Sequence, residues 1–175
     1  GIASNKPVSM NIINSLKKLE YRGYDSAGLA TLDKDEISEK KCSGRVEELE
    51  KILFKTPSDG HLGIGHVRWA THGVPNIVNA HPHSSEIVSV VHNGIIENSD
   101  ELKKNLESKG LRFKSQTDTE VITLLITEAL KDSKPLESVF KTLKKLKGSF
   151  ALGIIFKNYN NIIIGARRGS PLAVG

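Results

Sequence analysis

Five of the six histidines of this chain, together with its single tryptophan, fall between residues 65 and 94. The stretch reads GHVRWATHGVPNIVNAHPHSSEIVSVVHNG. Imidazole, guanidinium and amide groups gathered in this way can bind a charged small molecule, hold a metal ion or perform acid–base chemistry. The motifs within the stretch separate these possibilities.

The motif HVRWATHG places Arg68 and Trp69 at the end of a predicted strand. A guanidinium there can make two parallel hydrogen bonds to a carboxylate, which suits a small acidic ligand. A structural ion pair of Arg68, beside a tryptophan that covers the edge of the core, explains the same residues. The motif alone leaves both interpretations open.

The motif VVHNGIIEN places Asn93 and Gly94 directly after a buried strand. A side-chain amide beside an unhindered backbone N–H gives two donors that can converge on one oxygen, as an oxyanion hole requires. Asn-Gly is also the commonest signal for a hairpin turn. Similarly, Asp118 near a predicted helix start is explained either by a ligand or by the positive end of that helix.

A metal site is the third possibility for the histidines. His81 and His83 are two residues apart in HPH, and strand pairing could bring further ligands to them. These further candidates are His66, His72, His92 and Glu86. The sequence has no HExxH helix and no pair of cysteine motifs, so we expect no metal. Cys42 has no adjacent histidine to activate it, and we do not expect a catalytic thiol there.

Composition bounds the class of protein. The 175 residues suffice for one domain with a sizeable core, and 38% hydrophobic with 26% charged residues is typical of globular chains. No apolar run reaches the roughly 18 residues of a membrane span, and no signal peptide is visible, so we expect a cytoplasmic protein. The net charge of +5 would favour the binding of nucleic acid. However, aromatic residues, which stack on bases, make up only 5% of the chain, and the lysines of residues 135–148 follow one face of a predicted helix. We therefore expect no nucleic-acid partner.

Hydrophobic periodicity predicts the elements. The expected helices are residues 7–19, 45–54, 98–108, 117–131 and a lysine-faced one within 135–148. The expected strands are residues 1–4, 29–32, 37–41, 61–70, 86–94, 149–156 and 161–166. The helices that begin with NSDE and TDTE are predicted to have capping boxes. Strands and helices cluster rather than alternate, which predicts antiparallel or mixed sheets with helices outside them. Both ends of the chain look cut within strands, so we expect a fragment.

Taken together, LEYRGYDSAG, HVRWATHG, NAHPH, VVHNGIIEN and QTDTEVI closely resemble the glutaminase domain of the glutamine:fructose-6-phosphate aminotransferase family of class II glutamine amidotransferases. The resemblance extends over essentially the whole chain, to ARRGSPLAVG. It implies an α+β fold, a four-layer αββα N-terminal-nucleophile hydrolase sandwich, with residues 1–175 as one glutaminase domain. It further implies L-glutamine as substrate, no cofactor, downstream sugar-isomerase domains and a homodimer at full length.

The resemblance also implies roles for individual residues. Arg68 would bind the α-carboxylate of glutamine and Asp118 its α-ammonium group, while Asn93 and Gly94 would form the oxyanion hole. The residues expected to shape the pocket are Trp69, Thr71 and His72. Those expected to support it are Arg22, which would order the loop beside the nucleophile, and His81 and His83, which would hold the pocket loops.

The sequence departs from the family at its start. The family's nucleophile is an N-terminal cysteine, whereas Gly1 has no side chain. The spacing to EYRGYDSAG suggests that about four residues, resembling Cys-Gly-Ile-Val, precede Gly1 in the family. As written, the chain is expected to bind glutamine without cleaving it. The alternative is a non-catalytic, amino-acid-binding regulatory module for which Gly1 is the true terminus.

Overall fold

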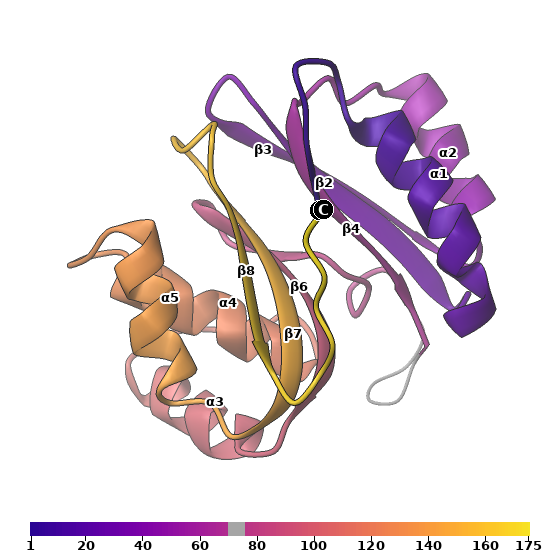
Figure 1. Ribbon diagram of the computed structural model, residues 1–175. Coiled ribbons are helices and arrows are strands. Elements are labelled where there is room, and N and C mark those ends of the chain that lie inside the picture. The colour runs from indigo at the N-terminus through magenta and orange to yellow at the C-terminus, as the bar shows by residue number, and fades with distance from the viewer. Residues whose placement is uncertain (70–75) are drawn as a thin grey trace.

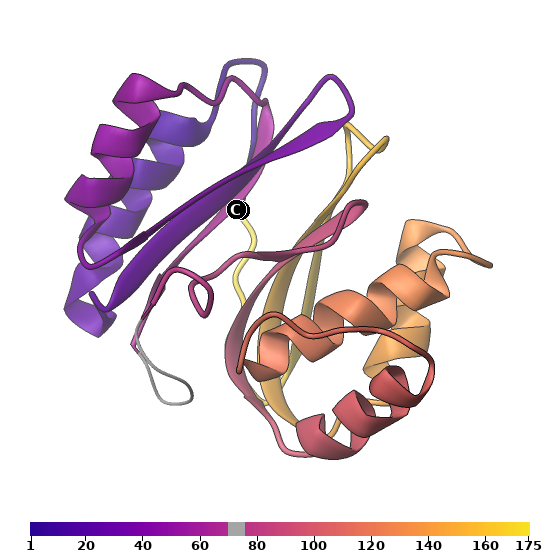
Figure 2. The same cartoon turned by 180° about the vertical axis from the view of Figure 1, so that it is seen from behind.

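The computed structural model describes residues 1–69 and 76–175. Two four-stranded sheets lie face to face, and helices cover the outer face of each (Figure 1). The helices on the first sheet are α1 (Ser9–Leu19) and α2 (Val46–Lys55). Those on the second are α3 (Ser99–Ser108), α4 (Asp118–Ala129) and α5 (Pro135–Leu143). The view from behind shows the same order of layers, helix, sheet, sheet, helix (Figure 2).

The first sheet is antiparallel, with the strand order β1-β4-β2-β3. Its strands are β1 (Ile2–Ala3), β2 (Ser26–Asp33), β3 (Glu36–Ser43) and β4 (Leu62–Arg68). Strands β2 and β3 form a hairpin, and its two turn residues, Lys34 and Asp35, both have positive φ. Such a turn matches the right-handed twist of the strands that it joins.

The second sheet is also antiparallel, with the strand order β5-β6-β7-β8. Its strands are β5 (His83–Ser84), β6 (Val88–Ile96), β7 (Gly148–Phe156) and β8 (Ile163–Arg168). The β6–β7 ladder runs without a break from Val88 to Ile96. Asn93 and Gly94 therefore lie inside a strand, and the hairpin-turn interpretation of this pair is wrong.

Three apolar layers hold the sheets and helices together. The largest lies between the second sheet and its helices, around Phe150 and Ile122. A second lies between the first sheet and α1 and α2, around Leu29 and Ile13. The third lies between the two sheets and is the smallest. Its buried members are Ala30, Leu32, Leu62, Ile64 and Ile155.

Two predictions about helix surfaces are wrong. Neither capping box forms, because the side chains of both candidate cap residues make other hydrogen bonds. The side-chain amide of Asn98 donates to the carbonyl of Lys145 and accepts from the N–H of Lys147. The Thr117 hydroxyl is hydrogen-bonded to His83. On α5, Leu136 and Phe140 are exposed, although their helical spacing with Val139 and Leu143 predicts that they share a buried apolar face. Of the five helices in the described ranges, none is long and apolar enough to cross a membrane.

Candidate active site

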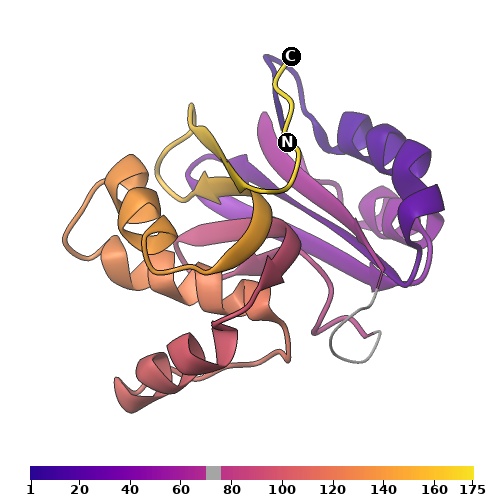
Figure 3. The same ribbon diagram turned by 60° about the horizontal axis from the view of Figure 1, so that its bottom comes forward.

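A cavity of about 550 Å³ opens between the two sheets at one end. It is lined by the ends of β4 and β6, the N-terminus of α4 and the short 3₁₀ helix η1 (Glu20–Arg22). The segment that follows β8 reaches it through Pro171, and Figure 3 shows this segment leaving the second sheet toward the side of the first. Elements that are far apart in the sequence thus converge here.

Strand alternation carries Arg68 into this cavity. Leu62 and Ile64 point into the apolar layer between the sheets, so His66 and Arg68 continue the same face of β4 beyond it. Arg68 is only 6% exposed. Burial lowers the pKa of its guanidinium, and the nearby carboxylates of Asp25 and Asp118 act in the opposite direction.

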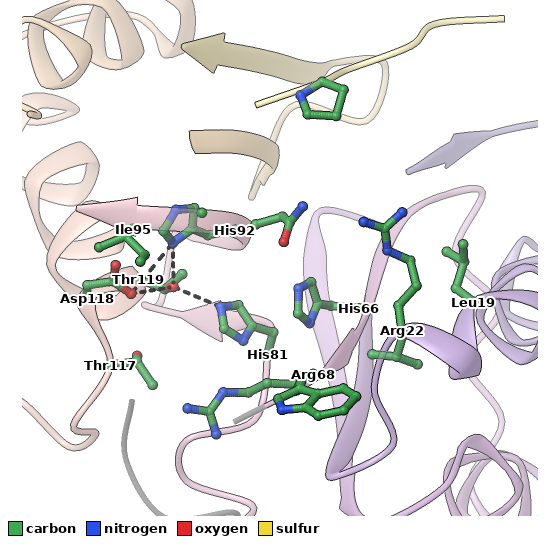
Figure 4. A pocket seen from close by; sticks show the side chains of 15 residues that line it. Leu19, Arg22, His66, Arg68, His81, His92, Ile95, Thr117, Asp118 and Thr119 are labelled. Atoms are coloured by element: carbon green, nitrogen blue, oxygen red, sulfur yellow. Dashed lines mark hydrogen bonds and ion pairs between the residues drawn. The ribbon is translucent and has the colours of Figure 1, made fainter. Parts of the chain in front are cut away.

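Asp118 lies in the same cavity as Arg68 (Figure 4). It is the first residue of α4, and its Oδ2 accepts a hydrogen bond of 2.8 Å from the backbone N–H of Ile96. That bond fixes the start of α4 against β6. A cation and an anion therefore line one cavity.

Asn93 and Gly94 line the cavity from β6. Gly94 has a φ of +138°, and a Cβ atom there would collide with the carbonyl oxygen of Ser149 on β7. Only glycine fits this position. The sequence motif is therefore a strand segment whose backbone is pressed against its neighbour at the edge of the cavity.

The remaining predicted site residues are distributed around this centre. Trp69, 63% exposed, lines the mouth of the cavity together with Arg22 of η1. His81 lines the cavity, whereas His83 is buried on β5 and is not part of the lining. Thr71 and His72 fall outside the described residues.

Four of the histidines form a group at the cavity, and three of them, His66, His81 and His92, line it. The rings of His66 and His81 stack with centroids 4.3 Å apart, and His83 meets His81 edge-on at 5.0 Å. Burial lowers the pKa of His66 to about 4 and that of His83 to about 3, and it lowers the pKa of His81 well below its ordinary range. These three rings are therefore neutral at pH 7.

Two threonines of the helix start connect this group to α4. The Thr117 hydroxyl lies 2.9 Å from His83 Nε2, and the Thr119 hydroxyl lies 2.8 Å from His81 Nε2 and 3.0 Å from His92 Nδ1. Neither threonine was predicted to belong to the site, because TDTE was interpreted as a capping box. The alternation of hydroxyl and acidic residues in QTDTE was the one signal that could have indicated them.

The described residues contain no group of three or more His, Cys, Asp or Glu side chains arranged to hold a metal ion. Among the candidate ligands that the structure covers, the imidazoles stack on one another or bond to threonine hydroxyls.

Comparison with protein families matches residues 75–170 to the glutamine amidotransferase domain. The chain belongs to this family. The whole chain is 52% identical to a glutamine–fructose-6-phosphate aminotransferase (isomerizing) of Mesorhizobium japonicum and 51% identical to one of Bradyrhizobium diazoefficiens. It spans 29% of the length of each. The predicted resemblance to the glutaminase domain of these aminotransferases is confirmed.

Solved structures confirm the fold of this glutamine amidotransferase domain. The glutamine phosphoribosylpyrophosphate amidotransferase of B. subtilis, in complex with ADP and GMP, superposes with a TM-score of 0.80 at 27% identity. The match covers 94% of this chain and 36% of that one. Together with the observed layers, it establishes the α+β, four-layer αββα sandwich of the N-terminal-nucleophile hydrolases.

Proposed function

We propose that this domain binds L-glutamine and hydrolyses its side-chain amide to glutamate and ammonia. The observation that carries the proposal is the shared cavity of Arg68, Asp118 and the Asn93–Gly94 pair. To bind a zwitterionic amino acid, one end of a site must present a cation to the α-carboxylate and an anion to the α-ammonium group. The amide carbonyl of glutamine needs hydrogen-bond donors at the other end, and one cavity holds all of these groups.

The proposed pose follows from the chemistry of the groups. Arg68 pairs with the α-carboxylate by two parallel hydrogen bonds, and Asp118 accepts from the α-ammonium group. The amide carbonyl of glutamine faces the Asn93 side chain and the Gly94 N–H. Alternate N–H groups of a strand point to the same edge, so the N–H of Gly94 is directed to the edge where Ile96 donates to Asp118. Trp69, Thr71 and His72 are proposed to shape the pocket, and Arg22 to order the loop beside the nucleophile.

The proposed nucleophile is a cysteine four residues before Gly1. The antiparallel register of β1 and β4 pairs Ile2 with Gly63 and Ala3 with Leu62. With the same register continued upstream, the fourth residue before Gly1 would lie opposite Arg68, at the cavity. A thiolate there lies on the sheet that faces Asn93, so nucleophile and oxyanion donors would approach the amide from two sides.

The reaction would then proceed by covalent catalysis. The thiolate adds to the amide carbon, and the oxyanion that forms accepts hydrogen bonds from Asn93 and Gly94. The C–N bond breaks, ammonia leaves with a proton relayed by the α-amino group of the cysteine, and a thioester remains. Water hydrolyses the thioester to glutamate and restores the thiol.

The larger protein is a further part of the proposal. The aminotransferases that resemble this chain are about three times as long. We infer downstream sugar-isomerase domains that use the ammonia to convert fructose 6-phosphate to glucosamine 6-phosphate, and a cytoplasmic homodimer. In the alternative, a regulatory module, the domain binds glutamine but does not hydrolyse it.

Titration calorimetry of the 175-residue chain with L-glutamine tests the binding site. Arg68→Ala removes a charge-assisted bidentate contact and should raise the Kd at least about tenfold, since hydrogen bonds to charged groups are worth about 1.5–3 kcal/mol. Arg112→Ala, a change at an exposed arginine between α3 and α4, is the matched control and should bind as the wild type does. An Arg68→Ala chain with wild-type affinity would remove Arg68 from the site.

A second measurement separates the enzyme from the regulatory module. The chain extended at its N-terminus by Cys-Gly-Ile-Val should release glutamate and ammonia from glutamine, and the same extension with serine in place of cysteine should do so far more slowly. An extended chain that binds glutamine and never releases glutamate supports the regulatory module instead.

A further inference from the structure

Thr119 is the meeting point of three side chains beside the cavity (Figure 4). Its Oγ1 lies 2.8 Å from His81 Nε2, 3.0 Å from His92 Nδ1 and 3.5 Å from Asp118 Oδ1. The residue is fully buried. A hydroxyl has one proton to donate and two lone pairs to accept with, so these three contacts use its whole capacity. The direction of each bond can therefore be worked out.

The proton of His92 belongs on Nδ1. This nitrogen lies 3.6 Å from Asp118 Oδ1 as well as 3.0 Å from the Thr119 hydroxyl. A bare lone pair facing a carboxylate would be repelled, whereas an N–H is attracted. The other ring nitrogen, Nε2, is buried and has no hydrogen-bond partner among the described residues, so an N–H at that position would have no acceptor.

The position of the proton on the His81 ring follows in the same way. Nδ1 of His81 is buried without a hydrogen-bond partner in the described part of the chain, so the proton belongs on Nε2, which faces Thr119. Both rings then donate to Thr119, and its own proton points to Asp118 Oδ1. This is the one arrangement of the three contacts that leaves neither ring with a buried N–H lacking an acceptor.

From these contacts we infer that Thr119 is a positioning residue of the glutamine site, which holds His81 and His92 in fixed tautomers while orienting Asp118. The inference rests on the role proposed for Asp118. Asp118 is held at Oδ2 by the Ile96 N–H and at Oδ1 by Thr119. His92, the other end of the same network, directly precedes Asn93 on β6. One buried hydroxyl thus connects the proposed ammonium ligand with the strand that carries the proposed oxyanion donors.

Two variants and a matched control test this role. Thr119→Val keeps the shape of the side chain and removes the hydroxyl, and Thr119→Ser restores it. Thr123→Val is the control, because Thr123 is an equally buried threonine one turn further along α4 whose hydroxyl donates to the backbone carbonyls of His83 and Thr119. Long-range ¹H–¹⁵N spectra of the histidine rings report the tautomers, and calorimetry reports the Kd for L-glutamine.

The wild-type chain should show His81 protonated at Nε2 and His92 at Nδ1. Thr119→Val should disturb this pattern and raise the glutamine Kd about tenfold, because Asp118, held at Oδ2 alone, would then have to be ordered when the ligand binds. Thr119→Ser and Thr123→Val should keep both the pattern and the affinity.

Two outcomes would overturn the inference: a wild-type proton on Nδ1 of His81 or on Nε2 of His92, or a Thr119→Val chain that binds glutamine as tightly as the wild type does. Failure of the wild type itself to bind glutamine would instead overturn the proposed function, and with it the positioning of Asp118 for that ligand. The ring spectra would still decide the tautomers in that case.

Discussion

Asn93 and Gly94 occupy neighbouring positions on β6 but are constrained differently. The Asn93 side chain lines the cavity from an exposed position, and the structure around it would tolerate a smaller residue. Gly94 is pressed against Ser149 of β7 and tolerates nothing larger. The two residues therefore lead to separate predictions, one for catalysis and one for stability.

Asn93→Ala in the cysteine-extended chain should lower the glutaminase kcat by about 100-fold to 1,000-fold, because one oxyanion donor contributes roughly 3 kcal/mol. Glutamate release under saturating glutamine measures this effect. Asn105→Ala, a change on the exposed face of α3, should leave kcat unaltered. A wild-type kcat in the Asn93 variant would exclude the amide from the oxyanion hole.

Gly94→Ala should destabilise the fold by about 2–3 kcal/mol, through the collision with the Ser149 carbonyl and the positive φ. Chemical denaturation measures the change in the free energy of unfolding. Gly110→Ala is the control, since Gly110 also has a positive φ of +86° but faces open space, and it should cost about 1 kcal/mol. Equal losses in the two variants would show that strain alone, without the collision, governs Gly94.

At this scale the sequence was informative wherever a motif had a chemical meaning of its own. Arg68, Asp118, Asn93 and Gly94 were all predicted and all line one cavity. Thr119 was not, because a threonine near a helix start has an ordinary local explanation. Its actual partners come from residues 81 and 92, and local sequence holds no record of such long-range contacts.

The N-terminus of α4 is the element on which the site depends most. The Glu120 carboxylate, predicted to bond back to the cap residue, instead accepts from the N–H groups of Lys114 at 2.9 Å and Ser115 at 2.7 Å. It therefore ties the incoming loop to the first turn of the helix. The bond is local, as the sequence indicated, but its donors lie in the loop before the helix and not at the predicted cap residue.

Glu120→Gln should destabilise the protein by about 1–3 kcal/mol, because one carboxylate oxygen becomes an NH₂ group that faces a backbone donor. Hydrogen exchange of residues 114–119 should accelerate as well. Glu101→Gln removes a carboxylate from the first turn of α3, where it is exposed, and should change stability by no more than about 0.5 kcal/mol. Unchanged exchange in the Glu120 variant would contradict the proposed tie.

The elements themselves were largely predictable, since apolar spacing reports which face is buried. The helices and long strands lie within a few residues of their expected bounds. The two-residue β5 was missed because so short a strand has no periodicity. The exposure of Leu136 and Phe140 was not predicted, because the spacing of apolar residues identifies an apolar helix face but does not determine whether another element covers it.

For the whole molecule, the buried histidines predict lability to acid. The folded-state pKa of His66 is about 4 and that of His83 about 3, below the ordinary value of 6.5. An unfolded chain takes up these protons first, so the stabilisation is complete above pH 6.5 and is lost progressively as the pH falls toward those values. Each such ring contributes a slope of up to about 1.4 kcal/mol per pH unit.

Urea denaturation at pH 7.5, 6.5, 5.5 and 5.0 should therefore show a falling free energy of unfolding below pH 6.5. His83→Gln should flatten the slope, whereas His61→Gln, a change at an exposed histidine, should leave it as it is in the wild type. A wild-type stability that stays level between pH 6.5 and 5.0 would be inconsistent with buried neutral rings.

The apolar layer between the two sheets is thin, and its packing affects the geometry of the cavity. Because Arg68 belongs to one sheet and Asn93 to the other, the packing between the sheets sets how far apart these two side chains lie. Ile155 is buried in that layer and absent from the lining of the cavity, so a substitution there would change the spacing of the two sheets without altering any residue of the cavity wall.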